Sequence, residues 1–305
     1  MEHTIAFPGL GIGPFELNRV AFTVFGFDIY WYAVMITLGL IMAASFGFYM
    51  CKRFSMKKED LVDGLLIILP LSVIGARLFF VIFNHQDYKT FWDVINIRDG
   101  GLGIWGALLV AFPAAVIFCK IKKLNIFSVL DLVAMGFFIG QSIGRWGNFF
   151  NAEVYGVATD LPWGMSINGG APVHPLFLYE SLINALGFVL AVLIYKYFKK
   201  RMAGDIALFY ITWYGLFRGL LEMLRPSQYV LYIGDSGIMT AVVLGFACAA
   251  AGITVFAVRH FVIKKKELPD GFYGEETIAE EKEVGAEAAE AETEDEKENE
   301  NGSDN

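Results

Sequence analysis

Arginine side chains within or beside apolar segments are the most unusual chemical groups of this 305-residue sequence. Arg77 and Arg218 each lie inside a long apolar run, and Arg145 follows directly after another. A guanidinium group carries a permanent charge and five N–H donors in a plane, an arrangement that matches the oxygens of a phosphate. These positions indicate either a site for a phosphate-bearing ligand or ion pairs that only stabilise the fold.

A group of four polar residues shares one face of an apolar segment that we expect to be helical. Its members are Tyr214, Arg218, Glu222 and Arg225. On a helical wheel the four lie within an arc of about 80°. Arg218 and Glu222 are four residues apart, a spacing at which opposite charges can pair and act structurally. Because that pair leaves Arg225 and Arg145 for an anion, we favour a lipid phosphate site over structural pairing alone.

The connection formed by residues 144–175 is expected to be a long loop outside the membrane, and it begins GRWGNFFNAEVYG. Asn148, Asn151 and Glu153 follow Arg145 closely and can form hydrogen bonds with a ligand. Near the end of the connection, His174 precedes Tyr179 and Glu180. His174 is a candidate general base. A histidine in a loop is also commonly a surface residue that only forms hydrogen bonds, and this alternative stays open.

Seven apolar segments, each long enough to cross a bilayer, recur along a chain that is 56% hydrophobic and only 18% charged. Soluble domains usually carry about 25% charged residues, and about 20 apolar residues span the hydrocarbon core as a helix. Since a membrane-spanning backbone must satisfy its own hydrogen bonds, the pattern predicts an all-α integral membrane protein. The seven transmembrane helices are expected near residues 30–50, 61–83, 102–119, 127–143, 176–195, 206–224 and 238–258.

Lysine and arginine are distributed unequally between the two sides of these segments. Fifteen follow the first, third, fifth and seventh segments, whereas five lie in the N-terminal segment and in the other connections. The positive-inside rule then places the N-terminus outside and the C-terminus in the cytoplasm. A soluble protein with buried helices would not produce this alternation.

The depth of the arginines follows from the same orientation. Arg77 and Arg218 each lie six residues before the outer end of their segment, or about 9 Å below it at the rise of an α-helix. We therefore expect Arg77, Arg145 and Arg218 to converge at the outer leaflet, at the level of a lipid phosphate. Each arginine taken singly could instead extend its side chain to the interface.

Three regions are expected from the charge and hydropathy patterns. Residues 1–29 form an outer N-terminal segment, and residues 30–258 form the membrane domain. Residues 259–305 comprise a basic stretch followed by a tail in which the last 39 residues carry a net charge of -14. Such a segment buries too little apolar area to offset its ordering entropy, so we expect a disordered cytoplasmic tail.

Several functional classes lack their sequence signatures. The body has no basic groove interleaved with aromatic residues, so no nucleic acid partner is expected. The three cysteines are far apart, which predicts neither a disulfide framework nor a metal site. No GxSxG, HExxH or P-loop motif is present. We expect no metal or cofactor, and if the protein is an enzyme, the nucleophile arrives with the substrate.

Residues Gly144 to Gly156 fit the pattern G-R-x-G-N-F-x-N-x-E-x-x-G, and the chain thereby resembles the bacterial prolipoprotein diacylglyceryl transferases. Further similar segments are Trp31-Tyr32, Gly75-Ala76-Arg77, Gly100-Gly101, His174-Pro175 with Tyr179-Glu180, and Tyr214 to Arg218 with Glu222 and Arg225. The resemblance covers about residues 20–260 and excludes the acidic tail.

This resemblance implies a seven-helix membrane enzyme that transfers the diacylglyceryl group of phosphatidylglycerol to a thiol. The acceptor is the lipobox cysteine of a preprolipoprotein, and glycerol phosphate is released. The resemblance makes Arg145 and Arg218 the central residues, and implies roles for Tyr32, Asn148, Glu153 and Gly156. We add Arg77, Asn151, Tyr214 and Arg225 as substrate-binding candidates, and Glu153, Glu222 and His174 as catalytic candidates.

The proton acceptor for the thiol remains open at this point. Some members of the family carry a histidine shortly after the Gly-Gly pair, where this chain has Trp105. An indole N–H cannot accept a proton, so Glu153, Glu222 or His174 serves, or the arginines lower the pKa of the thiol.

Two rival functions use the same cations. A transporter or lipid receptor would hold an anion without chemistry, but no repeat relates the two halves of the chain. A different phospholipid transferase would act on a hydroxyl group rather than on a thiol.

Overall fold

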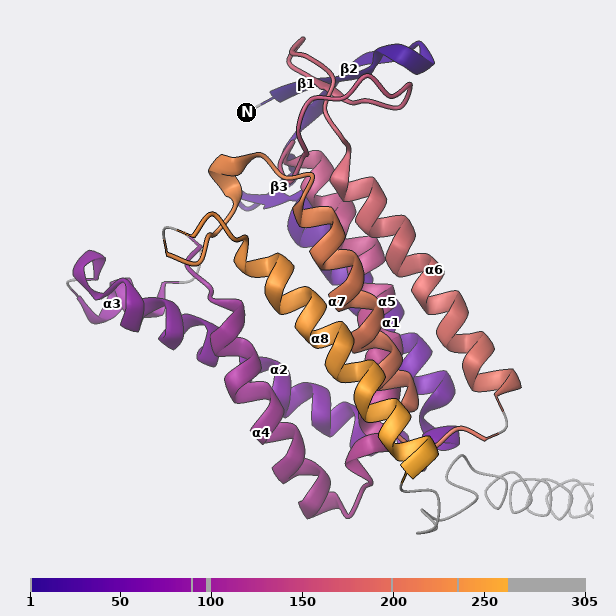
Figure 1. Ribbon diagram of the computed structural model, residues 1–305. Helices are drawn as coiled ribbons and strands as arrows, with labels where there is room; N and C mark the ends of the chain where they lie inside the picture. The colour runs from indigo at the N-terminus through magenta and orange to yellow at the C-terminus, as the bar shows by residue number, and fades with distance from the viewer. Residues whose placement is uncertain (1, 89, 97–99, 199, 235, 263–305) are drawn as a thin grey trace, which may run out of the picture. The chain divides into compact units, whose positions relative to one another are not determined.

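The computed structural model describes residues 2–88, 90–96, 100–198, 200–234 and 236–262 and is mostly helical (Figure 1). The chain divides into two compact units. Of the described residues, the first comprises residues 2–47 and 130–262, and the second comprises residues 48–129. Each unit is a body of its own.

Five long helices build most of the first unit. They are α1 (Trp31–Met50), α5 (Ile126–Phe150), α6 (Leu176–Tyr197), α7 (Asp205–Glu222) and α8 (Thr240–Ala257), with short 3-10 turns at Pro8–Leu10 and Ser227–Tyr229 and a π-helical turn at Val258–Val262. In Figure 1 the five run alongside one another. Ser142 of α5 contacts Ser181 of α6, and Trp213 of α7 donates a hydrogen bond to the carbonyl of Ile183 in α6. The contacts therefore link segments far apart in the sequence.

Glycines allow α7 and α8 to pack with their backbones in contact. A Cβ atom added to Gly215 would lie 2.5 Å from the carbonyl oxygen of Gly245, and one added to Gly245 would lie 2.6 Å from that of Gly215. Small residues of this kind characterise helix interfaces in membranes, where apolar side chains gain little from leaving lipid. This contact holds α7, which carries Arg218, against α8.

Short strands cover one end of the first unit. β1 (Glu2–Phe7) pairs antiparallel with β2 (Ile12–Asn18) and with β5 (Ser166–Ile167), while β3 (Val20–Val24) and β4 (Phe27–Tyr30) form a hairpin that leads into α1. The buried residues Ile5, Met165 and Phe177 form a core beneath the first sheet. The N-terminal segment is thus folded onto the connection between α5 and α6, a pairing that the all-α prediction did not include.

The second unit is built around two helices in close contact. Its elements are a 3-10 turn at Cys51–Phe54, α2 (Lys58–Phe83), a 3-10 turn at His85–Asp87, α3 (Phe91–Ile95) and α4 (Ile104–Lys122). A Cβ atom on Gly106 of α4 would lie 2.3 Å from the carbonyl oxygen of Gly75 in α2. At the other end of these helices, Lys122 pairs with Asp63 at 2.6 Å and with Asp60 at 3.3 Å.

Within the part of the chain that the structure describes, six helical segments are long and apolar enough to cross a membrane. They are Trp31–Phe54, Lys58–Phe83, Ile104–Lys122, Ile126–Phe150, Leu176–Tyr197 and Thr240–Val262. They correspond to six of the seven predicted segments. The remaining one is α7, which is helical as expected but carries Asp205, Arg218 and Glu222 within its 18 residues.

The predicted end of the fourth apolar segment, at Ile143, was wrong. Helix α5 continues to Phe150, so Arg145 lies in the helix and not in a loop. Aromatic contacts explain the extension, because Trp146 and Phe149 both pack against Phe177 of α6, with ring centroids 5.6 Å and 4.8 Å apart. The acidic tail lies outside the described residues.

Replacement of Gly215 by alanine is expected to lower the thermal stability of the detergent-solubilised protein by about 1–3 kcal/mol, the usual cost of overpacking. The added methyl group would force α7 away from the backbone of Gly245. Gly140→Ala is the control, because a Cβ atom there meets nothing within 4 Å. Equal thermal unfolding of the two variants would contradict the close approach of α7 and α8.

Candidate functional site

Three arginines and two glutamates form a continuous chain of ion pairs inside the first unit. Glu180 of α6 pairs with Arg145 of α5 and also lies 3.5 Å from Nη2 of Arg225. Nε of Arg225 lies 3.1 Å from Glu222 of α7, which in turn pairs with Arg218. Charges therefore alternate along the order Arg145, Glu180, Arg225, Glu222, Arg218.

The two carboxylates are the most deeply buried members of this chain. The side chains of Glu180 and Glu222 are 7% and 3% exposed, whereas those of Arg145 and Arg218 are each 22% exposed. The carboxylates neutralise guanidinium groups that would otherwise be costly within apolar helices. Because this series of ion pairs contains three arginines and two glutamates, the ion-pair chain has one positive charge in excess.

Arg145 and Arg218 occupy the two ends of the ion-pair chain. Each contacts a single carboxylate among the described residues. Because a guanidinium group has five N–H donors, each end retains donors that no described carboxylate occupies. An anion such as a phosphate can accept those hydrogen bonds, and Arg225, in the middle, contacts both carboxylates.

The motif of residues Gly144 to Gly156 forms the last two turns of α5 and the reversal that follows them. Oε1 of Glu153 accepts hydrogen bonds from Nδ2 of Asn148 at 2.8 Å and from Nδ2 of Asn151 at 3.1 Å. Ala152 and Val154 both adopt left-handed backbone conformations, with φ of 51° and 55°. The tight turn and the two amides hold the Glu153 carboxylate at the end of the helix.

Gly156 allows the backbone of the motif to pack closely against His174 and Leu224. A Cβ atom there would lie 2.7 Å from Cβ of His174 and 2.9 Å from the carbonyl oxygen of Leu224. Its backbone N–H donates to the carbonyl of His174 at 2.8 Å, and the next N–H, of Val157, donates to that of Leu224. Gly156 therefore joins the motif to the segment carrying His174 and to the end of α7.

His174 lies among aromatic side chains. Its Nδ1 is 3.2 Å from the hydroxyl of Tyr179, which also accepts a hydrogen bond from Nε1 of Trp163 at 2.7 Å. These contacts match the alternative that His174 forms structural hydrogen bonds. They are separate from the ion-pair chain.

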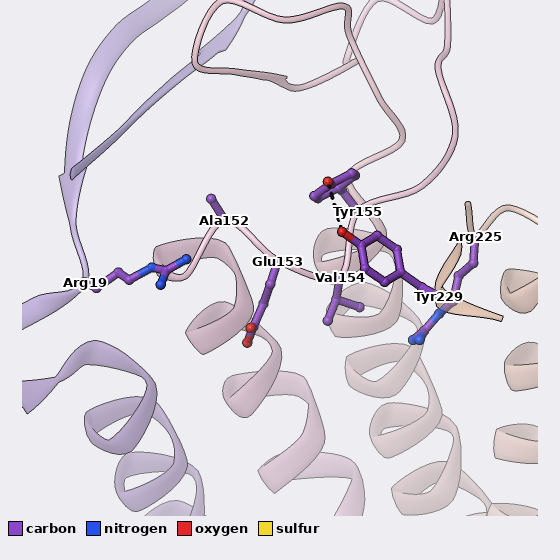
Figure 2. Close-up of a pocket in the computed structure, with 7 residues that line it drawn as sticks. All are labelled: Arg19, Ala152, Glu153, Val154, Tyr155, Arg225 and Tyr229. Carbon is purple, nitrogen blue, oxygen red and sulfur yellow. Dashed lines mark hydrogen bonds between the residues drawn. The ribbon is translucent and has the colours of Figure 1, made fainter. Parts of the chain in front are cut away.

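A cavity of about 550 Å³ adjoins the motif. It is lined by Arg19, Ala152, Glu153, Val154, Tyr155, Arg225 and Tyr229 (Figure 2). In this view Glu153 lies between Arg19 and Arg225, and the hydroxyls of Tyr155 and Tyr229 are 3.5 Å apart. Its volume falls within the range of about 300–1,000 Å³ typical of small-molecule sites. Arg225 belongs both to this cavity and to the ion-pair chain.

Arg77 lies in the second unit, where backbone carbonyl groups surround its guanidinium group. The donors reach the carbonyls of Asp93, Val94, Asn96, Gly100 and Gly101 at 2.6–3.0 Å, and Nη1 is 3.3 Å from the hydroxyl of Tyr88. Arg77 thus organises the segment between α2 and α4. Its expected convergence with Arg145 and Arg218 stays a prediction.

The remaining predicted residues have simpler surroundings. The ring of Tyr32 packs against Gly147, whose added Cβ atom would lie 2.8 Å from the ring. Tyr214 stacks on Tyr210 with ring centroids 5.8 Å apart. Trp105 is 56% exposed near the start of α4. Among the described residues, no group of three or more His, Cys, Asp or Glu side chains is arranged to hold a metal ion.

Two residues of this site, Glu180 and Arg19, were not predicted from the sequence. Glu180 was noted beside Tyr179 but was not assigned a role, although an acidic residue in the first turns of an apolar segment is as unusual as a buried arginine. Arg19 was counted only among the outer cations. Nothing in its local sequence indicates that its side chain reaches the carbonyl of Asn151, just after the end of α5.

The apolar helices and the buried ion-pair chain define a multi-pass membrane protein with an arginine-rich polar site. The sequence pattern of the prolipoprotein diacylglyceryl transferase family matches residues 19–258. The chain therefore belongs to that family. Since its relatives are bacterial, it is a multi-pass protein of a bacterial cell membrane.

Similar proteins include three named phosphatidylglycerol–prolipoprotein diacylglyceryl transferase. The Finegoldia magna protein is 42% identical over 219 residues, covering 72% of this chain and 87% of that protein. The Clostridioides difficile protein is 38% identical, covering 70% and 86%, respectively. The Listeria monocytogenes protein is 34% identical over 259 residues, covering 81% and 92%.

Replacement of Glu180 by glutamine is expected to destabilise the detergent-solubilised protein by about 2–4 kcal/mol, because it leaves two guanidinium groups without their shared buried counter-charge. Asp63→Asn is the matched control, since it weakens the more exposed pair with Lys122 and should cost less than about 1 kcal/mol. Denaturant unfolding monitored by tryptophan fluorescence would measure both. If both variants lost the same free energy of unfolding, Glu180 would stabilise the protein no more than an exposed carboxylate does.

Proposed function

We propose that the protein transfers the diacylglyceryl group of phosphatidylglycerol to the lipobox cysteine of preprolipoproteins. The observation that carries this proposal is the ion-pair chain with an excess of positive charge, which continues through Arg225 into the cavity beside the family motif. Membership of the family supports the same reaction. The substrates are a membrane lipid and a lipobox peptide.

The reaction is a substitution at the carbon of the diacylglyceryl group that is bonded to the phosphate oxygen. The cysteine sulfur forms a thioether bond to that carbon, the bond from carbon to the phosphate oxygen breaks, and glycerol phosphate leaves with the electron pair. Negative charge grows on the leaving oxygen, so preorganised cations stabilise the transition state. The protein supplies these cations as the guanidinium groups of its arginines.

Arg145 and Arg218 hold the phosphate in this proposal. Support comes from their positions at the ends of the ion-pair chain, where donors remain for a ligand. Glu180, Glu222 and Arg225 hold these arginines in place. The other substrate-binding candidates are Arg77, Tyr32, Asn148, Asn151, Gly156 and Tyr214, of which Asn148 and Asn151 act by orienting Glu153.

Glu153 is the best-placed proton acceptor for the thiol. It is exposed in the cavity, whereas Glu222 is engaged by two arginines and His174 contacts Tyr179. Both of its hydrogen bonds come from side-chain amides and leave lone pairs on the carboxylate. A carboxylate so oriented can accept the proton as the sulfur attacks.

The topology completes the proposal. In the proposed topology seven helices cross the membrane, and α7 is the one with a polar face at the site. Residues 1–29 and the connection within residues 144–175 then lie outside. The membrane domain is then residues 30–258, and residues 259–305 are cytoplasmic. The excess of basic residues on one side supports this orientation.

Alanine at Arg145 or at Arg218 is expected to reduce thiol lipidation at least about 100-fold, as for removal of one preorganised donor in other enzymes. Lysine at Arg218 should also perform poorly, because a point charge replaces a planar fork. The measurement uses purified protein, phosphatidylglycerol labelled in its acyl chains and a lipobox peptide.

Two controls separate this function from its rivals. A peptide with serine in place of cysteine should remain unlabelled, and glycerol phosphate should appear in proportion to labelled thiol peptide. Full activity of either alanine variant would overturn the assigned roles. A wild-type protein that binds the lipid but releases no glycerol phosphate would instead be a receptor or transporter.

Cysteine labelling in intact cells is expected to report opposite sides for two exposed positions. In a variant with Cys51, Cys119 and Cys248 replaced by alanine, Asp160→Cys should react with an impermeant maleimide. Lys200→Cys should react only after the cells are permeabilised. The reverse pattern would refute the proposed orientation while leaving the helices unchanged.

A further inference from the structure

Arg19 is the cation of the cavity that has no carboxylate partner. Arg225 shares Glu180 and Glu222, but no carboxylate in the described part of the chain lies within 4.0 Å of the Arg19 guanidinium. Among the described residues, its Nη2 donates only to the backbone carbonyl of Asn151, at 2.9 Å. The cavity therefore contains one guanidinium group that no described carboxylate contacts directly.

The position of Arg19 is fixed by its backbone as well as by its side chain. It lies between β2 and β3, and its carbonyl accepts a hydrogen bond from the N–H of Trp31, the first residue of α1. The side chain reaches the turn that carries Glu153, as Figure 2 shows. Arg19 is thus held at the cavity wall, where a ligand can contact it without rearrangement of the fold.

The other polar groups of the cavity suit hydroxyls. Glu153 presents a carboxylate, and Tyr155 and Tyr229 present hydroxyls that can both donate and accept. The hydrogen bond with Tyr229 and, to a lesser extent, burial raise the pKa of Tyr155, so its phenol stays neutral. Charged walls disfavour acyl chains, because burying these groups against hydrocarbon would cost free energy.

We propose that this cavity binds a glyceryl phosphate group, with Arg19 as a specificity residue that contacts an oxygen of the phosphate together with Arg145 and Arg218, and with Tyr155 and Tyr229 contacting the glyceryl hydroxyls. The group comes either from the headgroup of phosphatidylglycerol or from the glycerol phosphate released in the reaction. This inference rests on the proposed function, and it assigns the polar end of the lipid to the cavity and the reacting carbon to the region of Arg145 and Arg218.

The test compares the wild type with Arg19→Gln in the lipidation assay, with free glycerol phosphate as inhibitor. The substitution removes the hydrogen bond between the partly exposed Arg19 guanidinium and the phosphate. This loss is expected to weaken binding of the glyceryl phosphate group about threefold to tenfold. The KM for phosphatidylglycerol and the inhibition constant of glycerol phosphate should both rise by this factor, while kcat changes less than about twofold. A rise in KM alone identifies the lipid headgroup as the occupant, and a rise in the inhibition constant alone identifies the released product.

Controls exclude a general loss of charge or of structure. Arg53→Gln removes an exposed cation from the second unit and should leave both constants unchanged. Arg19→Lys keeps the charge and should restore part of the affinity, and it keeps the test possible if the glutamine variant does not fold. Tyr229→Phe should weaken inhibition by glycerol phosphate but not by inorganic phosphate.

Unchanged constants in Arg19→Gln would overturn the inference, as would a fall in Tm and kcat with no change in either constant, because that is the result of a purely structural role. These outcomes require that the wild type lipidates the thiol peptide. A wild type that leaves the peptide unmodified would instead refute the proposed function itself.

Discussion

The burial of guanidinium groups among apolar helices is the constraint on which the rest of this structure depends. An arginine at the centre of a membrane-spanning helix costs at least about 2.5 kcal/mol unless it is paired or hydrated. Glu180 and Glu222 meet this requirement by each contacting two arginines. Because these residues come from three different helices and from the segment after α7, α5, α6 and α7 must pack closely for the charges to be neutralised.

Close packing in turn requires small residues where backbones meet. Gly215 and Gly245 bring α7 and α8 together, and Gly156 brings the family motif against His174 and Leu224. The N-terminal strands and the connection between α5 and α6 then cover this end of the first unit. Arg19 reaches the site only through this covering layer, so the strands contribute to the cavity as well as to stability.

The excess of one positive charge gives the site its chemical character. If every arginine had its own carboxylate, the network would be neutral and an anion would gain little from binding. Two carboxylates shared by three arginines preserve both order and attraction for a phosphate. Arg77 shows the opposite solution, since backbone carbonyls occupy its guanidinium group and it organises a loop.

The sequence by itself determined the apolar helices, the motif around Arg145 and the shared face of Arg218, Glu222 and Arg225, because these depend on local periodicity and spacing. The tertiary structure decided that α5 continues past Arg145, that Glu180 joins two arginines and that Arg19 lines the cavity. Those features depend on contacts between residues far apart in the sequence, such as Trp146 with Phe177 and Arg19 with Asn151, which are 132 positions apart. Spacing along one segment carries no information about such contacts, since the partner that neutralises a charge or extends a helix is chosen only when distant segments pack.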